Sequence, residues 1–378
     1  MMDMMGIGII GCGNISTTYL TLAPLFKGLQ VRAVADMNMD VARARAAEYG
    51  VQAQTVEDLL ANPGIDLVIN LTIPDAHYAI SRRIVEAGKH VYSEKPLVLS
   101  LADGVALRDL AKAKGVSVGC APDTFLGGAH QQCRAMIDDG VLGTITAGAG
   151  VFMGPGMEMW HPNPTFFFQP GGGPMLDMGP YYIGNLINLI GPVKRVGALA
   201  SSAQATRTVT SQPNAGQVID VNTPTNIHAL LEFQSGATVT LSVSWDVFAH
   251  KRVPMELYGT QGCLFVPDPN FFGGAISMAG TDGKIVEVAG WDHPFSRFNQ
   301  DHPSMGPLAN YRTAGVADMA RAIREGGDAR CSLARTLHST EVMLAALQSG
   351  ETRQFVTLTT TCTQPAALGP DQAQALLI

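Results

Sequence analysis

The sequence predicts two domains: an N-terminal α/β domain with a doubly wound, parallel Rossmann sheet, and a C-terminal α+β domain with an open, largely antiparallel sheet. Strand-like and helix-like segments alternate over the first 120 residues, and β-type segments with period-two alternation dominate later. The length of 378 residues also exceeds the roughly 100–200 residues of a usual single domain. We place the boundary after Pro122, which gives domains of residues 1–122 and 123–378.

The N-terminal part alternates strands and helices in order. Apolar runs predict strands at residues 6–10, 30–35, 67–72, 90–93 and 116–120. The intervening segments predict helices at residues 15–26, 41–49, 56–61, 76–87 and 101–114. Glycines such as Gly50 and Gly115 follow several of these segments and are typical helix ends. Strands that alternate with helices of this length imply crossover connections, and therefore a parallel sheet.

The C-terminal part has a different pattern. Helices are predicted at residues 129–139, 178–190, 314–324 and 333–349, and strands at residues 145–153, 227–233 and 237–244. A loop rich in proline, glycine and aromatic residues joins them at residues 154–174. Pro180 is expected in the first turn of its helix, because proline interrupts a helix interior.

Charge and hydropathy exclude two classes of partner. The formal net charge is −7, and no run of the chain is rich in Lys and Arg. Nucleic acid is therefore not expected as a main partner, because phosphate binding needs clustered cations. No stretch of the sequence approaches about 18 uninterrupted apolar residues, so we expect no membrane span.

The six cysteines are scattered, without a C-x-x-C pair. This spacing predicts neither a disulfide framework nor a zinc site, and we expect no metal. The start of the chain has no basic segment followed by a long apolar run. These features favour a cytoplasmic protein.

A glycine-rich turn follows the first strand and opens the first helix. Residues 11–16, GCGNIS, have the pattern G-x-G-x-x-G with Ser16 in the third position. Gly11 permits the tight turn, Gly13 lets the backbone approach a pyrophosphate, and Ser16 is small enough for helix–sheet packing. The helix N-terminus then offers free N–H groups to phosphates. The turn residues expected to contact the cofactor are Gly11, Gly13, Asn14 and Ile15.

Asp36 ends the second strand, where a carboxylate can accept hydrogen bonds from both ribose hydroxyls. It would repel the 2′-phosphate of NADP, and no Arg follows within residues 37–39. The sequence therefore favours NAD over NADP as cofactor. The alternative is a structural glycine turn in another kind of α/β protein.

Three further segments follow in order: residues 72–77 (TIPDAH), 88–96 (GKHVYSEKP) and 171–181 (GGGPMLDMGPY). Together they resemble motifs of the Gfo/Idh/MocA oxidoreductase family, the group of glucose–fructose oxidoreductase and inositol dehydrogenase. The resemblance implies an NAD(P)-dependent dehydrogenase that acts on CH–OH groups. It also implies a cis Lys95–Pro96 bond that aims the lysine into the pocket. The further cofactor contacts that it implies are Thr72, Pro74, His77, Glu94 and Lys95.

This chain departs from the usual family pattern at one important position. Tyr181 stands where most members have a catalytic His, and Gly184 stands where an Asp is often found. Some members are similar in having Tyr here, so the change does not argue against catalysis.

Oxidation of a secondary alcohol needs a base for the hydroxyl proton and an acceptor for the hydride. Tyr181 is our candidate base, and Lys95 is the cation that would lower its phenol pKa from about 10. Asp177 is expected to hold Lys95 or to bind a substrate hydroxyl. The alternatives are a packing role for Tyr181, a solvated surface role for Lys95, and a helix cap at Asp177.

The substrate pocket is expected to be sparsely charged. Residues 160–168, WHPNPTFFF, combine aromatic faces for sugar C–H groups with His161 and Asn163 for hydroxyls. The alternative is a hydrophobic plug under the sheet. Asp123 follows the last Rossmann strand and is expected to accept a hydroxyl there. The expected substrate residues are Lys95, Asp123, Trp160, His161, Asn163, Asp177 and Tyr181.

These features predict an NAD-dependent dehydrogenase of a neutral sugar, sugar derivative or cyclitol. One alternative is an NAD-dependent glycosidase or epimerase that oxidises its substrate only transiently. Another is a dinucleotide-binding regulator without catalysis. An open sheet with an exposed apolar face also predicts a homodimer or homotetramer that assembles through the C-terminal sheet.

Overall fold

The protein is described here by a computed structural model of residues 4–302 and 306–378, which form two compact units. Among the described residues, unit 1 contains residues 4–127, 292–302, 306–337 and 368–378, and unit 2 contains residues 128–291 and 338–367. The division therefore differs from the predicted two successive domains. Two late segments return to unit 1, where Ser332 bridges to Gly119 and Leu377 bridges to Phe26. Such long-range pairing leaves no local pattern in the sequence.

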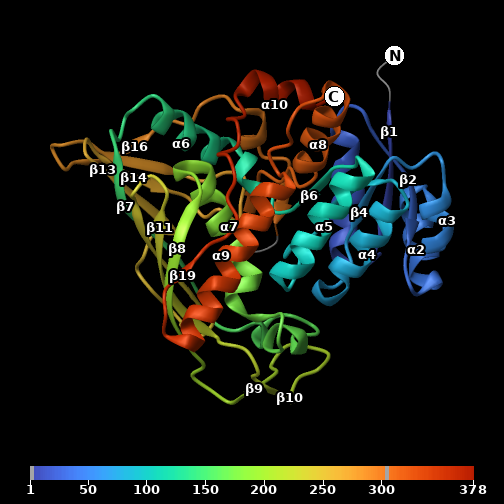
Figure 1. Ribbon diagram of the computed structural model, residues 1–378, viewed down its shortest axis with the longest axis horizontal. Coiled ribbons are helices and arrows are strands. Elements are labelled where there is room, and N and C mark those ends of the chain that lie inside the picture. The colour runs from blue at the N-terminus through green and yellow to red at the C-terminus, as the bar shows by residue number, and fades with distance from the viewer. Residues whose placement is uncertain (1–3, 303–305) are drawn as a thin grey trace. The chain divides into compact units, whose positions relative to one another are not determined.

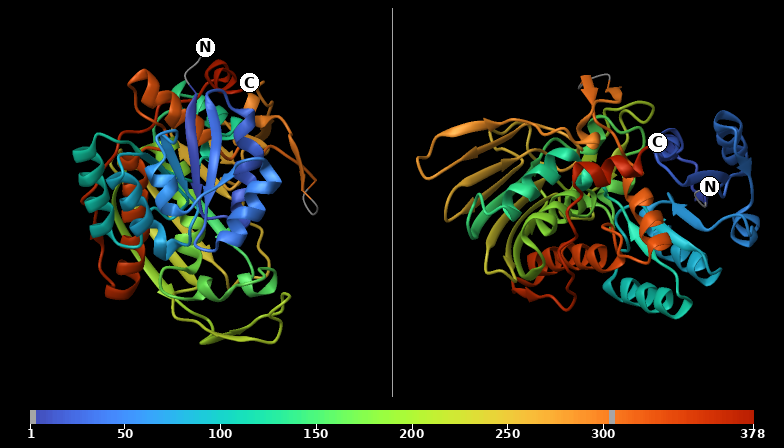
Figure 2. Two further views of the ribbon diagram at one scale, coloured as in Figure 1. Left: turned by 90° about the vertical axis from the view of Figure 1, so that its right-hand side faces the viewer. Right: turned by 90° about the horizontal axis from the view of Figure 1, so that it is seen from above.

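Unit 1 is built on a parallel sheet with the strand order β3-β2-β1-β4-β5-β6 (Figures 1 and 2). Its strands are β1 (Met5–Ile10), β2 (Leu29–Ala35), β3 (Gln52–Ala53), β4 (Leu67–Asn70), β5 (His90–Ser93) and β6 (Val118–Cys120). Its helices include α1 (Asn14–Leu22), α2 (Met39–Tyr49), α3 (Val56–Ala61), α4 (Pro74–Glu86), α5 (Leu101–Lys114), α8 (Ala314–Glu325) and α10 (Pro370–Leu376). The predicted doubly wound parallel sheet is confirmed.

Local chemistry explains where several unit 1 helices begin and end. The side chains of Asn38, Thr55 and Ser100 accept hydrogen bonds from backbone amides at the starts of α2, α3 and α5. Gly50 and Gly115 end α2 and α5 in the left-handed conformation, which glycine adopts without strain. The first helix is shorter than predicted, because a 3-10 turn with Pro24 follows α1.

Unit 2 contains an open sheet, several of whose strands are labelled in Figure 1. Its strand order is β16-β15-β14-β13-β7-β12-β11-β8-β19. Its strands are β7 (Ile145–Met153), β8 (Val193–Ser201), β11 (Asn226–Phe233), β12 (Thr238–Ser244), β13 (Met255–Gly259), β14 (Cys263–Val266), β15 (Ile276–Ala279), β16 (Ile285–Val288) and β19 (Val356–Thr357). β7 and β12 run parallel, and the other neighbours run antiparallel. The prediction of a largely antiparallel sheet is confirmed.

One face of this sheet is buried and the other is open to solvent. Along β11, Ile227, Ala229 and Leu231 are buried, whereas His228 and Leu230 between them are exposed. Helices α6 (Gly128–Asp138) and α7 (Gly173–Ile190) belong to the same unit, and α7 packs on β11 and β12. Helix α9 (Leu333–Thr352) begins in unit 1 and continues in unit 2.

The predicted start of the α7 helix at residue 178 is wrong. The helix begins at Gly173, and Gly172 is its N-cap residue. Asp177 therefore lies inside the helix and does not cap it, and Pro180 lies in the interior and not in the first turn. Pro174 in the first turn is favourable, since the first amides of a helix have no partner there.

Several short elements were not predicted. A hairpin of β9 (Thr206–Thr208) and β10 (Val218–Asp220) belongs to unit 2, and a second hairpin of β17 (Gln300–His302) and β18 (Gly306–Leu308) belongs to unit 1. Their three-residue strands are too short for a clear alternation. Over residues 4–302 and 306–378, none of the helices combines the length and apolar character needed to cross a membrane.

Candidate functional site

The predicted cofactor residues lie at one edge of the unit 1 sheet, directly after the carboxyl ends of its strands. The strands pair in parallel, so these ends share one edge. β1 lies between β2 and β4, and ligands of such sheets bind where the strand order reverses. The residues at this edge are Gly11, Gly13, Asn14 and Ile15 after β1, Asp36 after β2, Thr72, Pro74 and His77 after β4, Glu94 and Lys95 after β5, and Asp123 after β6.

The glycine turn has the geometry that a dinucleotide requires. Gly11 has φ +101°, and a Cβ there would lie 2.6 Å from the Leu71 carbonyl, so a side chain is excluded. Gly13 is exposed, and a Cβ there would meet no atom within 4 Å. α1 starts at Asn14 without a side-chain cap or an acidic residue in its first turn. The first turn of α1 therefore has no side-chain group that competes with a pyrophosphate.

Asp36 is fixed beside this turn by two backbone amides. Its Oδ2 accepts from the Cys12 amide at 2.8 Å and its Oδ1 accepts from the Asn38 amide at 2.8 Å. Because a carboxylate offers about four lone-pair sites, it retains acceptor capacity for ribose hydroxyls. The sequence did not point to Arg45, whose Nη2 lies 3.5 Å from the Cys12 carbonyl oxygen. Only the packing of α2 brings that side chain to the turn.

The Glu94–Lys95–Pro96 segment is held by hydrogen bonds, and its Lys95–Pro96 peptide bond is cis, as predicted. Glu94 Oε1 accepts from the Tyr19 hydroxyl at 2.9 Å, and its Oε2 accepts from the Lys95 amide at 3.0 Å. Burial and the neighbouring Glu94 carboxylate raise the pKa of Tyr19 well above its usual value. Glu94 therefore positions the backbone of Lys95. Tyr19 was missed because nothing in its own segment marks it.

His77 connects the loops that follow β4 and β5. The imidazole is buried, with Nδ1 2.6 Å from the Pro96 carbonyl oxygen and Nε2 2.9 Å from the Thr72 carbonyl oxygen. Burial lowers the pKa of His77, which favours the neutral ring. A neutral imidazole has one N–H, so it donates to one of the two carbonyl groups at a time. This placement fits a positioning role next to Lys95.

Asp123 has a different environment from the one its strand-end position suggested. The carboxylate is buried, and its Oδ2 accepts from the amides of Thr313 at 3.0 Å and Gly315 at 2.9 Å, at the start of α8. Burial raises the pKa of Asp123 to about 6. These contacts favour a structural role over the expected contact with a substrate hydroxyl. The amides lie 190 and 192 residues away in sequence, so no local pattern indicated them.

In unit 2, Asp177 and Tyr181 lie on one face of α7. They are four residues apart, which places their side chains one above the other on the helix. Asp177 is half-buried and Tyr181 is buried. The glycines before them allow close packing, because a Cβ on Gly172 would lie 2.4 Å from the Phe167 carbonyl oxygen. Residues 160–168, which we call the aromatic segment, are thus packed directly on the start of α7.

The two interpretations of the aromatic segment apply to different residues. Phe168 is fully buried in a cluster with Met157, Val209, Ile219 and Trp245, and is the predicted plug. Trp160 is 63% exposed and Phe166 is 43% exposed, although Phe166 packs against the Phe167 ring at a centroid distance of 4.0 Å. Phe168 therefore anchors the segment in the core of unit 2, whereas Trp160 and Phe166 remain partly exposed.

His161 lies among these rings as a neutral donor. Its ring makes edge contacts with Trp160, Phe166 and Phe167 at centroid distances of 5.5, 5.7 and 5.0 Å. Burial lowers the pKa of His161, while the charge of Asp177 opposes this shift. Nδ1 accepts from the amide of the exposed Asn163 at 3.1 Å. The proton of the neutral ring is therefore on Nε2, which is a donor.

A buried ion-pair network, which the sequence did not reveal, holds this segment. Arg207 on β9 bonds Glu158 at 3.0 Å and also contacts the Asp246 carboxylate. Asp246 also accepts from the Thr225 hydroxyl at 2.7 Å, and Arg207 lies over the ring of Phe168.

The Glu158 backbone carbonyl accepts from the Thr210 and Ser211 amides. The hairpin of β9 and β10 is thereby attached to the aromatic segment.

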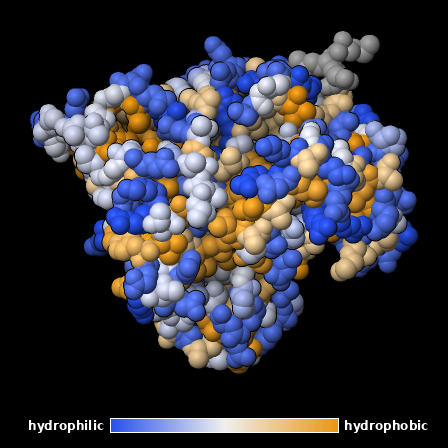
Figure 3. Space-filling view, viewed as in Figure 1, coloured by the Kyte–Doolittle hydropathy of each residue, from blue (hydrophilic) through white to orange (hydrophobic). Residues whose placement is uncertain are grey.

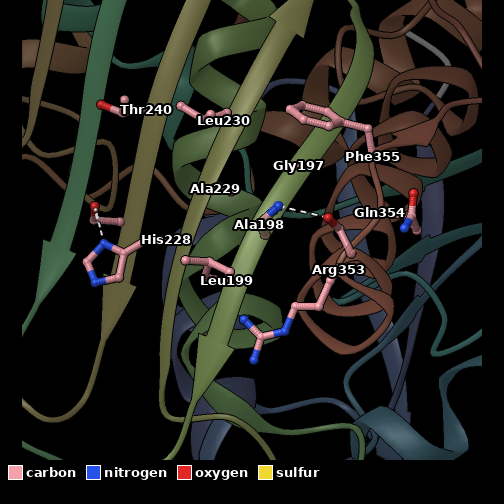
Figure 4. A pocket seen from close by; sticks show the side chains of 12 residues that line it. Gly197, Ala198, Leu199, His228, Ala229, Leu230, Thr240, Arg353, Gln354 and Phe355 are labelled. Carbon is pink, nitrogen blue, oxygen red and sulfur yellow. Dashed lines mark hydrogen bonds between the residues drawn. The ribbon is translucent and has the colours of Figure 1, made fainter.

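The outer face of the unit 2 sheet has a separate, apolar groove of about 470 Å³ (Figure 4). Leu199, Leu230 and Phe355 line it and are 59%, 53% and 57% exposed. His228 lies at its side and bonds the Ser242 hydroxyl at 2.9 Å. Figure 3 shows further hydrophobic surface on the viewed face. Exposed apolar surface of this kind marks an interaction face more often than a catalytic pocket.

Comparisons with known proteins agree on both parts of the chain. Residues 5–121 match the family model of an oxidoreductase family with an NAD-binding Rossmann fold, and residues 130–265 match the GFO/IDH/MocA C-terminal domain. The levoglucosan dehydrogenase of Pseudarthrobacter phenanthrenivorans is 25% identical over an alignment of 369 positions, which covers 88% of this chain and 93% of that protein. The inositol 2-dehydrogenase/D-chiro-inositol 3-dehydrogenase of Lactiplantibacillus plantarum is 32% identical over an alignment of 148 positions, which covers 36% of this chain and 41% of that protein.

A solved structure of a levoglucosan dehydrogenase in complex with NADH has the same fold, with a TM-score of 0.80 and 21% identity. The similarity covers 94% of this chain and 99% of that one. The apo form of levoglucosan dehydrogenase gives a TM-score of 0.82 at 22% identity, over 96% of this chain and 100% of that one. Together with the two family matches, these findings show that the chain belongs to the Gfo/Idh/MocA family of oxidoreductases and has an NAD-binding Rossmann domain.

Proposed function

We propose that the protein transfers a hydride between NAD and a secondary hydroxyl of a neutral sugar, sugar derivative or cyclitol. The observation that supports this most directly is the strand edge of unit 1, where the open glycine turn, Asp36 and Lys95 follow neighbouring strands. Relatives named as levoglucosan, D-xylose and inositol dehydrogenases support the substrate class.

In this proposal, NAD supplies the hydride acceptor and the chain supplies orientation and proton transfer. Lys95 donates a hydrogen bond to the reacting oxygen, and Tyr181 takes the hydroxyl proton as the base. Asp177, one helical turn from Tyr181, binds a substrate hydroxyl. Glu94 and His77 hold the loop of Lys95 through its amide and the Pro96 carbonyl.

The preference for NAD over NADP rests on Asp36. Its two carboxylate oxygens are held by backbone amides beside the glycine turn, so the charge cannot easily turn away from an added 2′-phosphate. Arg45 approaches the same turn, but its Nη1 bonds Glu48 at 2.6 Å, which offsets its charge.

The proposal is tested by NADH absorbance with NAD, across a panel of neutral sugars, glycosides and cyclitols, with NADP as the control cofactor. A steady rise with one substrate class is the expected result. Bound NAD with no rise, and with breakdown or epimerisation of a substrate, would instead indicate transient oxidation. NAD binding with no conversion of any substrate would indicate a regulator.

We also propose that two copies of the chain pack through the outer face of the unit 2 sheet. The groove lined by Leu199, Leu230 and Phe355 gives this face the apolar surface that subunit contacts use. Light scattering should give a mass of two or four times 40.0 kDa. Leu230→Glu should shift it toward 40.0 kDa, and a monomeric wild-type protein would contradict the proposal. The cytoplasmic location remains a prediction from the sequence.

A further inference from the structure

We propose that Trp160 and Phe166 form an outer subsite that binds the flat, apolar face of a group attached to the reacting sugar. This inference rests on the proposed function and narrows its substrate class. The natural substrate would then be a glycoside, with its reacting ring at Asp177 and Tyr181 and its second group on the aromatic rings. We call the two rings and His161 between them the aromatic platform.

The exposure of the platform is the first observation that supports a ligand. Trp160 and Phe166 are 63% and 43% exposed, although the same segment buries Phe168 completely. Leaving large apolar surface in water is unfavourable by about 25 cal/mol per Å². Neighbouring exposed aromatic side chains are therefore typical of a binding surface and not of a random loop.

The second observation is that the platform is rigidly supported. The His161 carbonyl accepts from the Ser211 hydroxyl at 2.6 Å, and the Pro162 carbonyl accepts from the Asn214 amide group at 2.8 Å. The Trp160 amide donates to the Met157 carbonyl. These bonds fix the backbone on both sides of His161. A preformed surface of this kind loses little conformational entropy when a ligand binds.

The buried network adds support from below. Arg207, Glu158 and Asp246 are almost completely buried, so their charges are held in place by one another. Glu158 lies two residues before Trp160, and the ion pair therefore sets the position of the chain where the platform begins. Burying charges is costly, and its clearest use here is to fix a surface that would otherwise move.

The third observation is the order of side chains within unit 2. Tyr181 and Asp177 are neighbours on α7. The start of α7 packs against the aromatic segment, since a Cβ on Gly172 would lie 2.4 Å from the Phe167 carbonyl oxygen. His161 contacts both Trp160 and Phe166. The helix that holds Asp177 and Tyr181 therefore adjoins the segment that holds the aromatic rings. A molecule that places one sugar ring on the polar groups extends its next group toward the platform.

The platform itself defines the chemistry of that second group. Its surface consists of aromatic faces and a neutral imidazole, with a donor at His161 Nε2. It therefore suits a flat, uncharged group with an apolar face. The glycosidic oxygen that joins this group to the reacting sugar would be the hydrogen-bond acceptor. Both an aryl group and a second sugar ring have such a face.

The test compares methyl and phenyl glycosides of the same sugars, with the matching disaccharides as a third arm. KM and kcat are measured by NADH absorbance, and Kd is measured by calorimetry on the NADH-saturated protein, which cannot oxidise the glycoside. In the wild type, we expect the phenyl glycoside to bind about tenfold more tightly than the methyl glycoside, as one aromatic contact of about 1.4 kcal/mol gives. Trp160→Ala should remove this ratio, because it deletes a ring of the platform that the phenyl group would contact.

Phe248→Ala is the matched control, since Phe248 is an 85% exposed aromatic residue of the same unit. It should leave the ratio unchanged. A disaccharide that binds like the phenyl glycoside identifies a second sugar ring as an accepted group, and one that binds like the methyl glycoside restricts the subsite to aryl groups. Equal Kd values for methyl and phenyl glycosides, or an unchanged ratio in Trp160→Ala, would overturn the subsite.

The two proposals fail in different ways. If no glycoside is oxidised but the phenyl forms still bind more tightly through Trp160, the dehydrogenase proposal fails and the subsite stands. If methyl glycosides are oxidised as well as phenyl glycosides in every variant, the dehydrogenase proposal stands and the subsite fails. Absence of both binding and turnover for every glycoside would refute the subsite.

Discussion

The strand edge of unit 1 and the aromatic platform of unit 2, the two proposed sites, hold their side chains in opposite ways. At the strand edge, Gly11, Asp36 and Lys95 each follow a buried strand by one or two residues. The platform belongs to no regular sheet, and Arg207 holds it through contacts with residues 49 and 39 positions away. The first site is a consequence of topology, whereas the second depends on a particular tertiary network.

The two sites should therefore respond differently to substitution. A strand edge is fixed by the hydrogen bonds of the whole sheet, so a single side chain there can be changed without moving its neighbours. A site that depends on one buried cation loses its support when that cation is removed. The following substitutions test this contrast, beginning with the largest expected effect.

Lys95→Ala should lower kcat by about 10²- to 10⁴-fold, because it removes the cation that assists proton transfer. NAD affinity should change by less than about threefold, since the glycine turn and Asp36 are unaffected. NADH absorbance measures the rate, and fluorescence titration measures the affinity. Lys114→Ala, at the exposed end of α5, is the control. Wild-type turnover by the Lys95 variant would refute its assigned role.

Arg207→Met should destabilise unit 2 by about 3–5 kcal/mol, because it leaves the buried Glu158 and Asp246 carboxylates without their cation. Denaturant unfolding followed by tryptophan fluorescence reports this, since Trp245 lies in the adjoining cluster. NAD binding by unit 1 should persist.

The matched control is Arg195→Met, in an exposed ion pair with Glu232 of the same unit. It should change stability by less than about 1 kcal/mol. If Arg207→Met costs no more than this control, the platform does not depend on the buried network. If it abolishes NAD binding, the contrast between the two regions is wrong.

Asp36→Asn should weaken NAD binding by about 10- to 100-fold, because charged hydrogen bonds to ribose hydroxyls contribute about 1.5–3 kcal/mol. The relative affinity for NADP should rise, since repulsion of its 2′-phosphate is reduced. Fluorescence titration with both reduced cofactors gives the ratio. Asp40→Asn, an exposed residue paired with Arg43, should have no such effect. An unaltered NAD to NADP ratio in the Asp36 variant would show that this carboxylate does not face the ribose.

Asp123→Asn should alter the pH dependence of stability by about 1–3 kcal/mol. Burial raises the pKa of Asp123 to about 6, so between pH 4 and 6 the native state holds its proton more firmly than the unfolded state. Stability contributed by this group is therefore present at low pH and is lost as the pH rises through about 6. The amide of Asn keeps an oxygen acceptor for the Thr313 and Gly315 amides without titrating.

The measurement is the free energy of unfolding of both proteins in urea at pH 4.5, 5.5 and 7. The variant should gain stability relative to the wild type as the pH rises across this range. A difference between the two proteins that stays constant with pH would show that the Asp123 carboxyl titrates normally.

Much of unit 1 could be predicted because its signals are local. Each strand and helix has its own periodicity, and parallel strands always bring their carboxyl ends to one edge. The position of Lys95 at that edge follows from its place after β5, and its cis bond to Pro96 agrees with the family resemblance. At this strand edge, the difference from the prediction concerns a hydrogen-bond partner and not a position. Asp123 follows β6 as expected, but its carboxylate is occupied by the start of α8.

The sequence by itself determined the parallel sheet, the glycine turn, the preference for NAD and the presence of an aromatic segment at residues 160–168. Each of these depends on residues within about one strand or helix of one another, where spacing and chemistry are visible in the chain. The tertiary structure alone decided that α8 and α10 belong to unit 1, that Tyr19 holds Glu94, and that Arg207 supports the platform. The physical reason is that a buried polar group must find a partner wherever packing supplies one, and packing joins residues without regard to their separation in sequence.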